Sequence, residues 1–526
     1  MNFKITLSAM LLPLTAVSST HCKAQNFPEK GKIRPNILYI MSDDHSYQTI
    51  SAYGYGLNKT PNIDRIGQEG VVFRNSFICN SLSGPARAVI LTGKFSHMNG
   101  YRDNAPGAIF DGSQQTFPKI LQKAGYQTAV IGKWHLGSLP TGFDYYSVHT
   151  GQGTYYNPDF IEPDGNKLYQ GYATDLTATN TMKWLDGRNK DKPFMVMMHF
   201  KAPHRNWMPA PGKMGMYEDV TFPIPETFYD TYEGRQAAKE QKMSVALDME
   251  IGNDNKILGH NTDKGDLPNE LYRMDSKQRR AWDNTYVPII AEYNANPRTG
   301  KELAEWKYQR YMRDYLKCVS SVDDNVGRVI DYLKKNGLWE NTIVIYTSDQ
   351  GFYMGEHGWF DKRFMYEQSF RTPLLMSYPN GIKKDLKDIG GLVQSIDYAP
   401  TFLDYAGVEI PSDMQGESLK PLLSGQKSSV HDAIYYHYYE YPLPHGVKRH
   451  YGIRDSRYKL VHFYFDIDKW ELYDLEKDPA EMNNLIDNPS YKKVKDSMMK
   501  KLKDLQVKYK DENATNDGYI DPRFGK

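Results

Sequence analysis

Cysteine is scarce in this chain, which has only Cys22, Cys79 and Cys318 among its 526 residues. An odd number of cysteines without a Cys-x-x-Cys spacing gives no readable disulfide framework and no structural zinc site. A chain of this length can bury a core large enough to do without covalent cross-links. The cysteines therefore leave the redox compartment of the protein open.

An excess of either charge is also missing. The chain has 65 Lys and Arg against 64 Asp and Glu, a formal net charge of +1 at pH 7. Proteins that bind nucleic acid or membrane surfaces in general carry a strong basic excess, so we expect neither of these partners. Any recognition of an anion must come from a local group of side chains.

Long apolar runs are absent beyond the amino terminus, so no membrane span is expected. At the amino terminus, Lys4 precedes an apolar run over residues 5–17, which is too short to cross a bilayer. This pattern predicts a secretory signal peptide over residues 1–24 and an exported protein, periplasmic or secreted. A lipid anchor on Cys22 is the alternative, but the residues before it are poor small-residue neighbours for lipoprotein cleavage.

What the chain does contain is a series of short apolar runs rich in β-branched residues. They predict buried strands at residues 36–42, 127–132, 194–200, 342–348 and 374–378. Amphipathic stretches lie between them, for example residues 311–336, where valines recur at helical spacing. This alternation predicts an α/β layered sheet, in which ligands gather at the carboxyl ends of the strands.

Two regions depart from this pattern. Residues 206–307 are rich in Pro, Asp, Asn and Gly and predict a long excursion over the surface that could shape the rim of a pocket. The last part of the chain predicts strands at 433–441, 451–464 and 470–475 and a charged helix at 491–510. We therefore expect a main domain over residues 25–430 and a small antiparallel subdomain over residues 431–526.

Acidic and amide side chains follow two of the predicted strands. Asp43 and Asp44 come directly after the first, and Asp349 and Gln350 follow the strand at 342–348. Buried carboxylates repel one another unless a cation lies between them, and calcium takes six to eight such oxygen ligands. Asp43 and Asp44 taken alone could equally end a solvated loop. Both strand ends together predict an oxygen-rich calcium site.

A further motif begins at residue 83. The pattern Ser83-x-Pro-x-Arg87-x-x-x-Leu-Thr-Gly resembles the signature of the formylglycine-dependent sulfatases, in its serine form. It specifies both residue identities and their spacing, and other marks of that family follow in order, so the resemblance covers residues from about 34 to 485. It implies an alkaline-phosphatase-like α/β sheet flanked by helices, with a smaller carboxy-terminal subdomain.

The resemblance implies that an activase oxidises Ser83 to formylglycine. One hydroxyl of the hydrated aldehyde would lie on the metal and attack sulfur, and loss of a proton from the second would expel sulfate. A plain serine would stay sulfated. Read without the family, Ser83 could also be the N-cap of a helix. Cys79 lacks the downstream Pro and Arg, so we interpret it as a buried small residue.

The resemblance also implies roles for groups that follow other strands. Arg87, one helical turn after Ser83, would reach the modified residue and the carboxylates. Lys133 would bind a sulfate oxygen, and His135 would take the proton from the second hydroxyl. A lone lysine-histidine pair is more often exposed and without a role, but this pair follows a predicted buried strand.

Three more positions match the family. His204, after the strand at 194–200, would bind sulfate and help protonate the leaving alcohol. Lys362 would be the second cation on the sulfate and another possible acid. Gln350 stands where asparagine is commoner in the family but keeps the amide oxygen that a metal needs.

The residues beside Lys362 suggest a substrate. Asp361 and Arg363 could hydrogen-bond adjacent sugar hydroxyls, although an internal ion pair is the alternative. The loop at residues 441–451 resembles the substrate-side loop of bacterial glycosaminoglycan sulfatases, where His445 or His450 could close the pocket or could be structural.

Taken together, these features are most similar to sulfatases that remove 6-O-sulfate from N-acetylglucosamine or glucosamine at glycan ends. They imply an exo-acting enzyme for sulfated mono- or oligosaccharides such as heparin or heparan sulfate fragments. Two alternatives stay open besides another glycan sulfatase or an arylsulfatase. One is a phosphoesterase of the same superfamily that uses unmodified Ser83, and the other is a protein that binds sulfated glycans without turnover.

Overall fold

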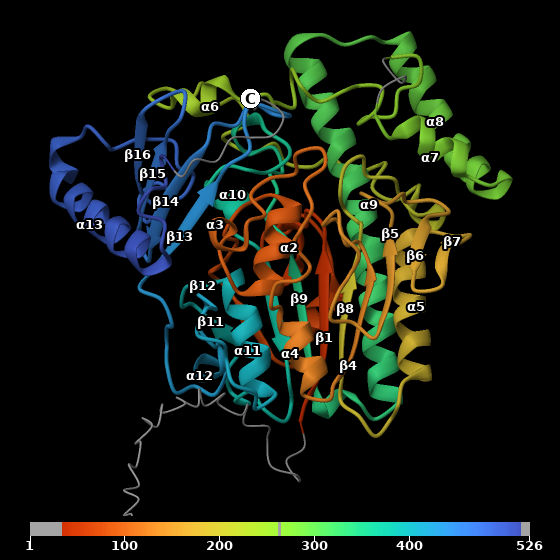
Figure 1. Cartoon of the computed structure of the whole chain (residues 1–526). Coiled ribbons are helices and arrows are strands. Elements are labelled where there is room, and N and C mark those ends of the chain that lie inside the picture. Colours follow the sequence, from red (N-terminus) through yellow and green to blue (C-terminus); the bar gives the residue numbers. More distant parts are fainter. Residues whose placement is uncertain (1–33, 261–264, 517–526) are drawn as a thin grey trace, which may run out of the picture.

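The computed structural model describes residues 34–260 and 265–516, so the predicted signal peptide and Cys22 lie outside the described residues. A mixed ten-stranded sheet runs through the main body in the order β11-β2-β10-β9-β1-β8-β4-β5-β6-β7 (Figure 1). Its strands are β1 (Asn36–Ser42), β2 (Val71–Phe73), β4 (Gln127–Gly132), β5 (Tyr145–His149), β6 (Asp159–Glu162), β7 (Gly165–Leu168), β8 (Phe194–His199), β9 (Thr342–Ser348), β10 (Leu374–Ser377) and β11 (Asp388–Ile389). All five strands predicted for the main domain are therefore present.

The middle of this sheet is parallel: β9, β1, β8, β4 and β5 are neighbours that run in one direction. Their carboxyl ends consequently lie at one edge. β10 runs antiparallel to β9. A small two-stranded sheet pairs β3 (Ser76–Phe77) with β12 (Val393–Gln394).

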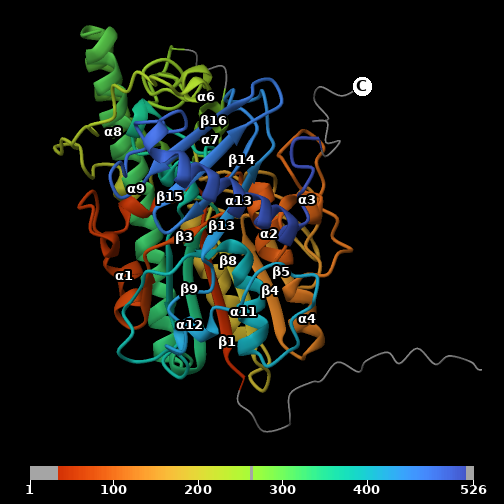
Figure 2. The same ribbon diagram turned by 90° about the vertical axis from the view of Figure 1, so that its left-hand side faces the viewer.

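Helices cover both faces of the sheet, as the α/β prediction required. Figure 2 shows the sheet between one layer that contains α1 (Pro61–Gln68) and α9 (Gly300–Lys335) and another that contains α4 (Phe117–Lys123) and α11 (Tyr398–Tyr405). Alternate residues of β1 explain this arrangement, because Leu38 and Ile40 join the core on the α9 side while Ile37 and Tyr39 join the core on the α11 side. The remaining helices on these faces are α5 (Ala173–Gly187) and α2 (Ser83–Thr92), and short helices are α3 (Ser96–Asn99), α10 (Glu367–Phe370) and α12 (Lys420–Leu423).

The region expected to be an excursion is more helical than the sequence indicated. It contains α6 (Gln236–Glu240), α7 (Leu267–Arg273) and α8 (Ser276–Ala295), and α9 begins at residue 300 rather than 311. Pro288 lies inside α8, and a proline is not expected within a helix. The helix begins after Asp275, whose side chain accepts hydrogen bonds from the backbone N–H groups of Lys277 and Gln278. In Figure 1, α7 and α8 stand at the upper right, beyond the edge where the parallel strands end.

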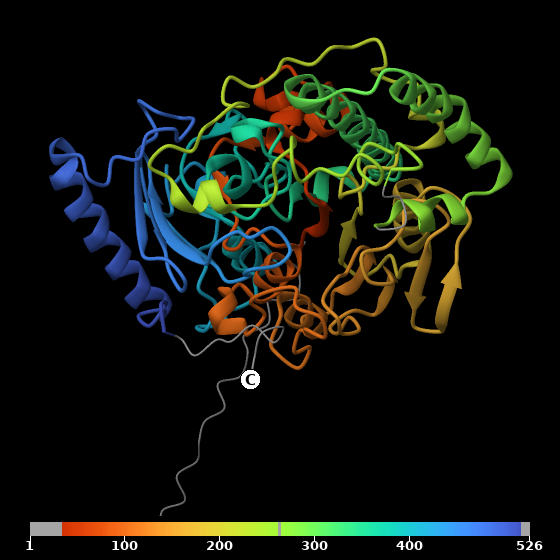
Figure 3. The same cartoon turned by 90° about the horizontal axis from the view of Figure 1, so that it is seen from above.

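The last part of the chain forms a four-stranded antiparallel sheet of β13 (Ala433–Tyr438), β14 (His450–Asp455), β15 (Tyr458–Phe463) and β16 (Lys469–Asp474). Helix α13 (Lys492–Tyr509) covers its outer face, and the sheet lies between α13 and the main body (Figure 3). This confirms the predicted antiparallel subdomain with its helix, although the stretch predicted as one strand at 451–464 folds into the two strands β14 and β15. The boundary near residue 430 stays a prediction.

The inner face of this second sheet packs on the segment that follows β9. Tyr436, Tyr438 and Phe463 share one apolar cluster with Phe364 and other residues of that segment. The carboxy-terminal sheet therefore supports the loop that contains Lys362. Within the described part of the chain, no helix is long and apolar enough to cross a membrane. Cys79 and Cys318 are both buried and free within the same part.

Candidate active site

The order of the parallel strands brings the predicted residues to one edge of the sheet. Asp349 and Gln350 follow β9, and Asp43 and Asp44 follow the adjacent β1. The segment after β8 carries His204, and the segment after β4 carries Lys133 and His135. Ser83 begins α2 at the same edge and hydrogen-bonds to Asp43.

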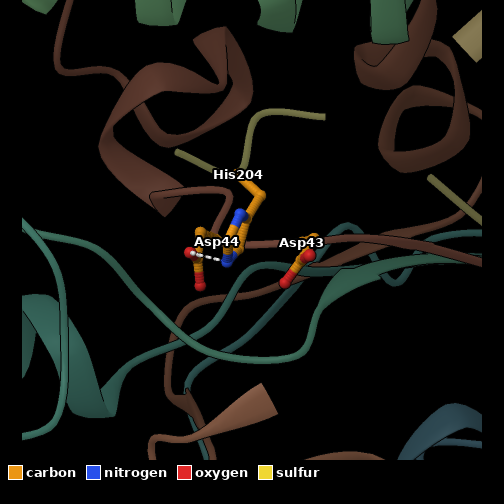
Figure 4. A group of neighbouring side chains, drawn as sticks. All are labelled: Asp43, Asp44 and His204. Atoms are coloured by element: carbon orange, nitrogen blue, oxygen red, sulfur yellow. Dashed lines mark ion pairs between the residues drawn. The ribbon is translucent and has the colours of Figure 1, made fainter. Parts of the chain in front are cut away.

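A buried acidic cluster forms the floor of the site. The backbone N–H of Asp44 donates to Oδ1 of Asp349 at 3.1 Å, so the ends of β1 and β9 are joined. Asp43, Asp44 and His204 offer ligand atoms that all lie within 4.8 Å of one another. Figure 4 shows the His204 ring turned toward Asp44, and its Nε2 lies 3.8 Å from Oδ2 of that residue. The Nδ1 of His204 faces the Arg205 carbonyl at 2.7 Å, which leaves Nε2 directed to the cluster.

The hydroxyl of Ser83 lies among these groups. Its Oγ is 3.1 Å from Oδ1 of Asp43, 3.2 Å from Nε2 of Gln350 and 3.3 Å from Nζ of Lys362. The N-cap interpretation of Ser83 is wrong, because Ser83 is the first residue of α2, and Leu82 takes the cap position without a side-chain hydrogen bond in the described chain. Its hydroxyl points to the acidic cluster instead.

Arg87 joins the cluster from one turn further along α2. Its guanidinium donates to Oδ2 of Asp349 at 3.0 Å and to the carbonyl of Lys133 at 2.8 Å. The side chain is almost fully buried. Arg87 therefore holds the ends of β9 and β4 in place from the helix that carries Ser83.

Two lysines balance the acids. Lys133 forms an ion pair with Asp43, and Nζ of Lys362 lies 2.5 Å from Oδ1 of Asp44. Burial raises the pKa of Asp43, but the positive charges of Lys133 and neighbouring groups hold it well below its usual value. The pKa of Asp44 rises to about 7, because burial and the nearby carboxylates outweigh the attraction of Lys362.

The residues of this cluster fit a hard divalent cation. Burial and the charge of Asp43 raise the pKa of Asp349. The neighbouring positive side chains therefore do not fully offset the repulsion between these closely spaced carboxylates. The amide oxygen Oε1 of Gln350 is buried and has no hydrogen-bond partner among the described residues. A cation held by Asp43, Asp44 and Asp349 would relieve the repulsion. The amide of Gln350, whose Nε2 faces Asp44 and Ser83, would have to turn over to give that cation its oxygen. Because these groups offer only oxygen, they suit calcium or magnesium rather than zinc.

Gln152 connects two of the predicted catalytic groups and was missed by the sequence reasoning. Its Oε1 accepts from Nζ of Lys133 at 2.5 Å, and its Nε2 lies 2.9 Å from Nε2 of His135. A lysine ammonium has only donors, so the amide NH₂ faces His135, whose Nε2 must accept. Burial and the charge of Lys133 lower the pKa of His135 well below its usual value, which keeps the ring neutral. Gln152 follows β5, a strand that the sequence did not predict.

The predicted substrate-side residues also meet. Nε2 of His445 lies 2.7 Å from Oδ2 of Asp361, and Nε of Arg363 lies 3.5 Å from Oδ1 of the same residue. The Nδ1 of His445 is 2.8 Å from the carbonyl of Lys242, so a segment from the predicted excursion borders the site. Burial raises the pKa of Asp361, but His445 and Arg363 hold it well below its usual value.

His450 does not belong to this group. Its ring is fully buried, its Nε2 accepts from the backbone N–H of Met365 at 3.1 Å, and its Nδ1 lies 2.7 Å from the carbonyl of Lys448. Between the two histidines that the sequence left open, His450 is the structural one and His445 faces Asp361.

Several site residues adopt a left-handed backbone conformation that non-glycine residues seldom take. The φ angles are 65° at Asp44, 55° at His135, 78° at Asp361 and 100° at Arg363. Such strain is costly and concentrates where the surrounding structure must aim a side chain. It therefore marks the same edge of the sheet as the polar cluster does.

Two protein families and several known proteins resemble this chain in sequence. Residues 35–408 match the family described as "Sulfatase", and residues 355–508 match the one described as "N-sulphoglucosamine sulphohydrolase, C-terminal". The N-acetylglucosamine-6-O-sulfatase of Bacteroides thetaiotaomicron is 52% identical over 515 residues, which span 96% of this chain and 91% of that protein.

A more distant relative and a solved structure are also similar to this chain. An arylsulfatase of Clostridium perfringens is 26% identical over 538 residues, which span 93% of this chain and 98% of that protein. A solved protein in complex with its substrate, D-glucosamine-2-N,6-O-disulfate, superposes with a TM-score of 0.89 at 50% identity and covers 92% of this chain and all of that one.

Proposed function

Because the chain belongs to the sulfatase family, we propose that it removes the 6-O-sulfate from terminal N-acetylglucosamine or glucosamine in sulfated mono- or oligosaccharides. Heparin and heparan sulfate fragments are glycosaminoglycans that offer such residues. The observation that carries this proposal is the 50% identical solved protein with glucosamine-2-N,6-O-disulfate as its substrate. The enzyme is a sulfatase, and the sugar and the position of the sulfate are the proposed part.

Two groups that the family uses would be held by residues described above. Calcium would be held by the oxygens of Asp43, Asp44, Asp349 and Gln350 and would supply positive charge beside residue 83. Conversion of Ser83 to formylglycine by an activase would supply a hydrated aldehyde, and hence two hydroxyls, in place of one hydroxyl.

The side chains of the protein itself bind the sulfate and move protons. Lys133, which pairs with Asp43, and Lys362, whose Nζ is 3.3 Å from Oγ of Ser83, supply positive charge to the sulfate oxygens as negative charge develops on them. His135 is neutral, and its accepting nitrogen Nε2, which faces the amide of Gln152, would act as the base once it turns from that amide to residue 83. His204 directs Nε2 to the same cluster. Burial lowers its pKa well below the usual value, so it would protonate the ester oxygen of the leaving alcohol once the negative charge of bound sulfate favours the charged ring.

The sugar would lie against Asp361, Arg363 and His445. These side chains are beside Lys362 and form one connected group. The Nε of Arg363 is buried and lacks a hydrogen-bond partner within residues 34–260 and 265–516, so a donor is left for a ligand. A carboxylate and a guanidinium placed side by side can hydrogen-bond adjacent sugar hydroxyls.

Export completes the proposal. The predicted signal peptide over residues 1–24 would direct the protein to the periplasm or the medium, where glycan fragments are met. We also propose the division into a catalytic domain over residues 25–430 and a supporting subdomain over residues 431–526.

The deciding experiment uses protein purified from a host that has the serine-oxidising activase. Mass spectrometry of the peptide that contains Ser83 should show the loss of two hydrogen atoms, and the protein should release sulfate from N-acetylglucosamine 6-sulfate. Unmodified serine together with hydrolysis of phosphate esters would favour the phosphoesterase alternative. Unmodified serine together with binding but no turnover would favour a glycan-binding protein.

A further inference from the structure

Glu440 occupies a buried position between the substrate-side residues and the beginning of α2. It lies two residues beyond β13 in the carboxy-terminal subdomain and is 2% exposed. Its Oε1 accepts from NH1 of Arg363 at 2.5 Å, and its Oε2 accepts from the backbone N–H of Asn104 at 3.2 Å. A buried carboxylate is costly unless its partners are fixed, so this position is tightly constrained.

Asn104 extends the same connection toward the reacting group. Its Oδ1 accepts from the backbone N–H of Gly84, the residue after Ser83, at 3.2 Å. The approach is close enough that a Cβ at Gly84 would collide with Oδ1 of Asn104 and lie 2.6 Å from the Tyr101 ring. Glu440 therefore contacts both the loop that carries Arg363 and the loop that supports the start of α2.

The other end of the connection is a strained arginine. Arg363 has a φ of 100°, and its guanidinium lies between two carboxylates, those of Asp361 and Glu440. The guanidinium is planar, so fixing NH1 on Glu440 and holding Nε near Asp361 fixes the directions of all its N–H groups. Nε remains without a hydrogen bond in the described structure. Glu440 thus determines where an unused donor of Arg363 points.

We propose that Glu440 is a positioning residue for substrate specificity, which aims the guanidinium of Arg363 at the hydroxyls of the sugar. The inference deepens the proposed function and rests on it. It gives the carboxy-terminal subdomain a part in choosing the sugar, although the groups that bind sulfate all come from the main domain. Glu440 acts through Arg363 and does not touch the reacting atoms.

The first test is a split between KM and kcat on two substrates. Glu440→Gln keeps the shape of the side chain but removes its charge, so Arg363 loses one of its two carboxylate partners. The KM for N-acetylglucosamine 6-sulfate should rise about tenfold, the effect of roughly one charged hydrogen bond, with kcat nearly unchanged. Both parameters for nitrophenyl sulfate, which has no sugar hydroxyls, should stay close to those of the unaltered enzyme. Equal losses on the two substrates would overturn the inference.

The second test measures binding without turnover. In Ser83→Ala protein, Glu440→Gln should weaken binding of N-acetylglucosamine 6-sulfate about tenfold by calorimetry. When Arg363→Ala is also present, Glu440→Gln should add almost nothing, because its effect passes through that arginine. Losses that simply add in the combined variant would show that Glu440 acts by another route.

A matched control removes a different buried carboxylate of the same subdomain. Asp455 on β14 pairs with Lys501 of α13, so Asp455→Asn should leave both KM values unchanged. Should Glu440→Gln fail to fold, Glu440→Asp keeps the charge, shortens the reach to Arg363 and should raise KM in the same direction. If the unaltered protein prefers a different sulfated sugar, the proposed substrate is wrong, and the same comparison on that sugar decides the role of Glu440.

Discussion

The Oγ of Ser83 lies 3.1 Å from Oδ1 of Asp43, so the first residue of α2 meets the first residue beyond β1. This contact places the group that would be modified beside the group that would bind a metal. Ser83 is almost fully buried, and Nζ of Lys362 is 3.3 Å from the same hydroxyl. The chemistry at residue 83 would therefore depend both on a metal held there and on the cations of the same cluster.

Removal of calcium should abolish activity and lower stability. The chelated protein should regain activity when Ca²⁺ is added, because Asp43, Asp44, Asp349 and Gln350 offer only oxygen ligands. At a Ca²⁺ concentration of about 100 times Kd, binding should stabilise the fold by about 2.7 kcal/mol, which thermal unfolding can measure. Full occupancy by zinc in the active enzyme would contradict this prediction.

Ser83→Ala should eliminate turnover and leave the fold nearly unchanged. The substitution removes one oxygen from a site whose other groups are held by their own contacts. Sulfate release should be undetectable, while the thermal unfolding temperature and the Kd for N-acetylglucosamine 6-sulfate should stay close to those of the unaltered protein. Residual turnover in Ser83→Ala would show that the nucleophile is another group.

Gln152→Glu should shift the acidic limb of the pH profile of kcat/KM to higher pH. His135 acts as a base only when it is neutral, and a carboxylate beside it favours the charged ring and so raises its pKa. Gln152→Ala is the comparison, since it removes the bridge to Lys133 without adding charge and should cause no such upward shift. An unmoved acidic limb in Gln152→Glu would argue against His135 as the base.

Asp361→Asn and Arg363→Ala should damage the hydrolysis of sugar sulfates more than that of aryl sulfates. A lost charged hydrogen bond is worth on the order of 1.5 to 3 kcal/mol, or about one to two decades in kcat/KM. The measurement compares N-acetylglucosamine 6-sulfate with nitrophenyl sulfate on the same variants. Losses of equal size would mean that these residues support Lys362 or the metal ligands and do not bind the sugar.

Glu270→Gln should change how stability depends on pH. Glu270 is buried on α7 and accepts from the backbone N–H groups of Tyr155 and Tyr156, and Tyr155 in turn hydrogen-bonds to the carbonyl of His204. Burial raises the pKa of Glu270 to about 7 in the folded protein. The unfolded chain therefore loses this proton first, and the glutamate costs stability as the pH rises from its unfolded pKa to about 7.

The glutamine variant lacks that proton and that cost. The difference in unfolding temperature, variant minus unaltered protein, should therefore be more positive at pH 8 than at pH 5. A difference that does not change with pH would show that Glu270 titrates at its ordinary value. Activity assays at both pH values would then report whether the support that Tyr155 gives to His204 matters for turnover.

The sequence by itself predicted the main sheet and much of the site because both depend on local signals. Buried strands read as continuous apolar runs, and residues that follow parallel strands meet at one edge. The strand ends alone therefore predict that Asp43, Asp349 and Lys133 lie together. The motif at Ser83 added the position of the nucleophile through its resemblance to a family.

Tertiary structure alone decided which loops meet. Gln152 and Glu440 carry no local signal, since each is an ordinary polar residue in a loop whose partners lie far away along the chain. The same holds for the choice between His445 and His450, which differ only in what surrounds them. Helix α8 was not predicted, because it contains a proline and its few buried residues are spread among polar ones. Contacts between distant segments are set by packing in three dimensions, and short-range sequence patterns do not encode them.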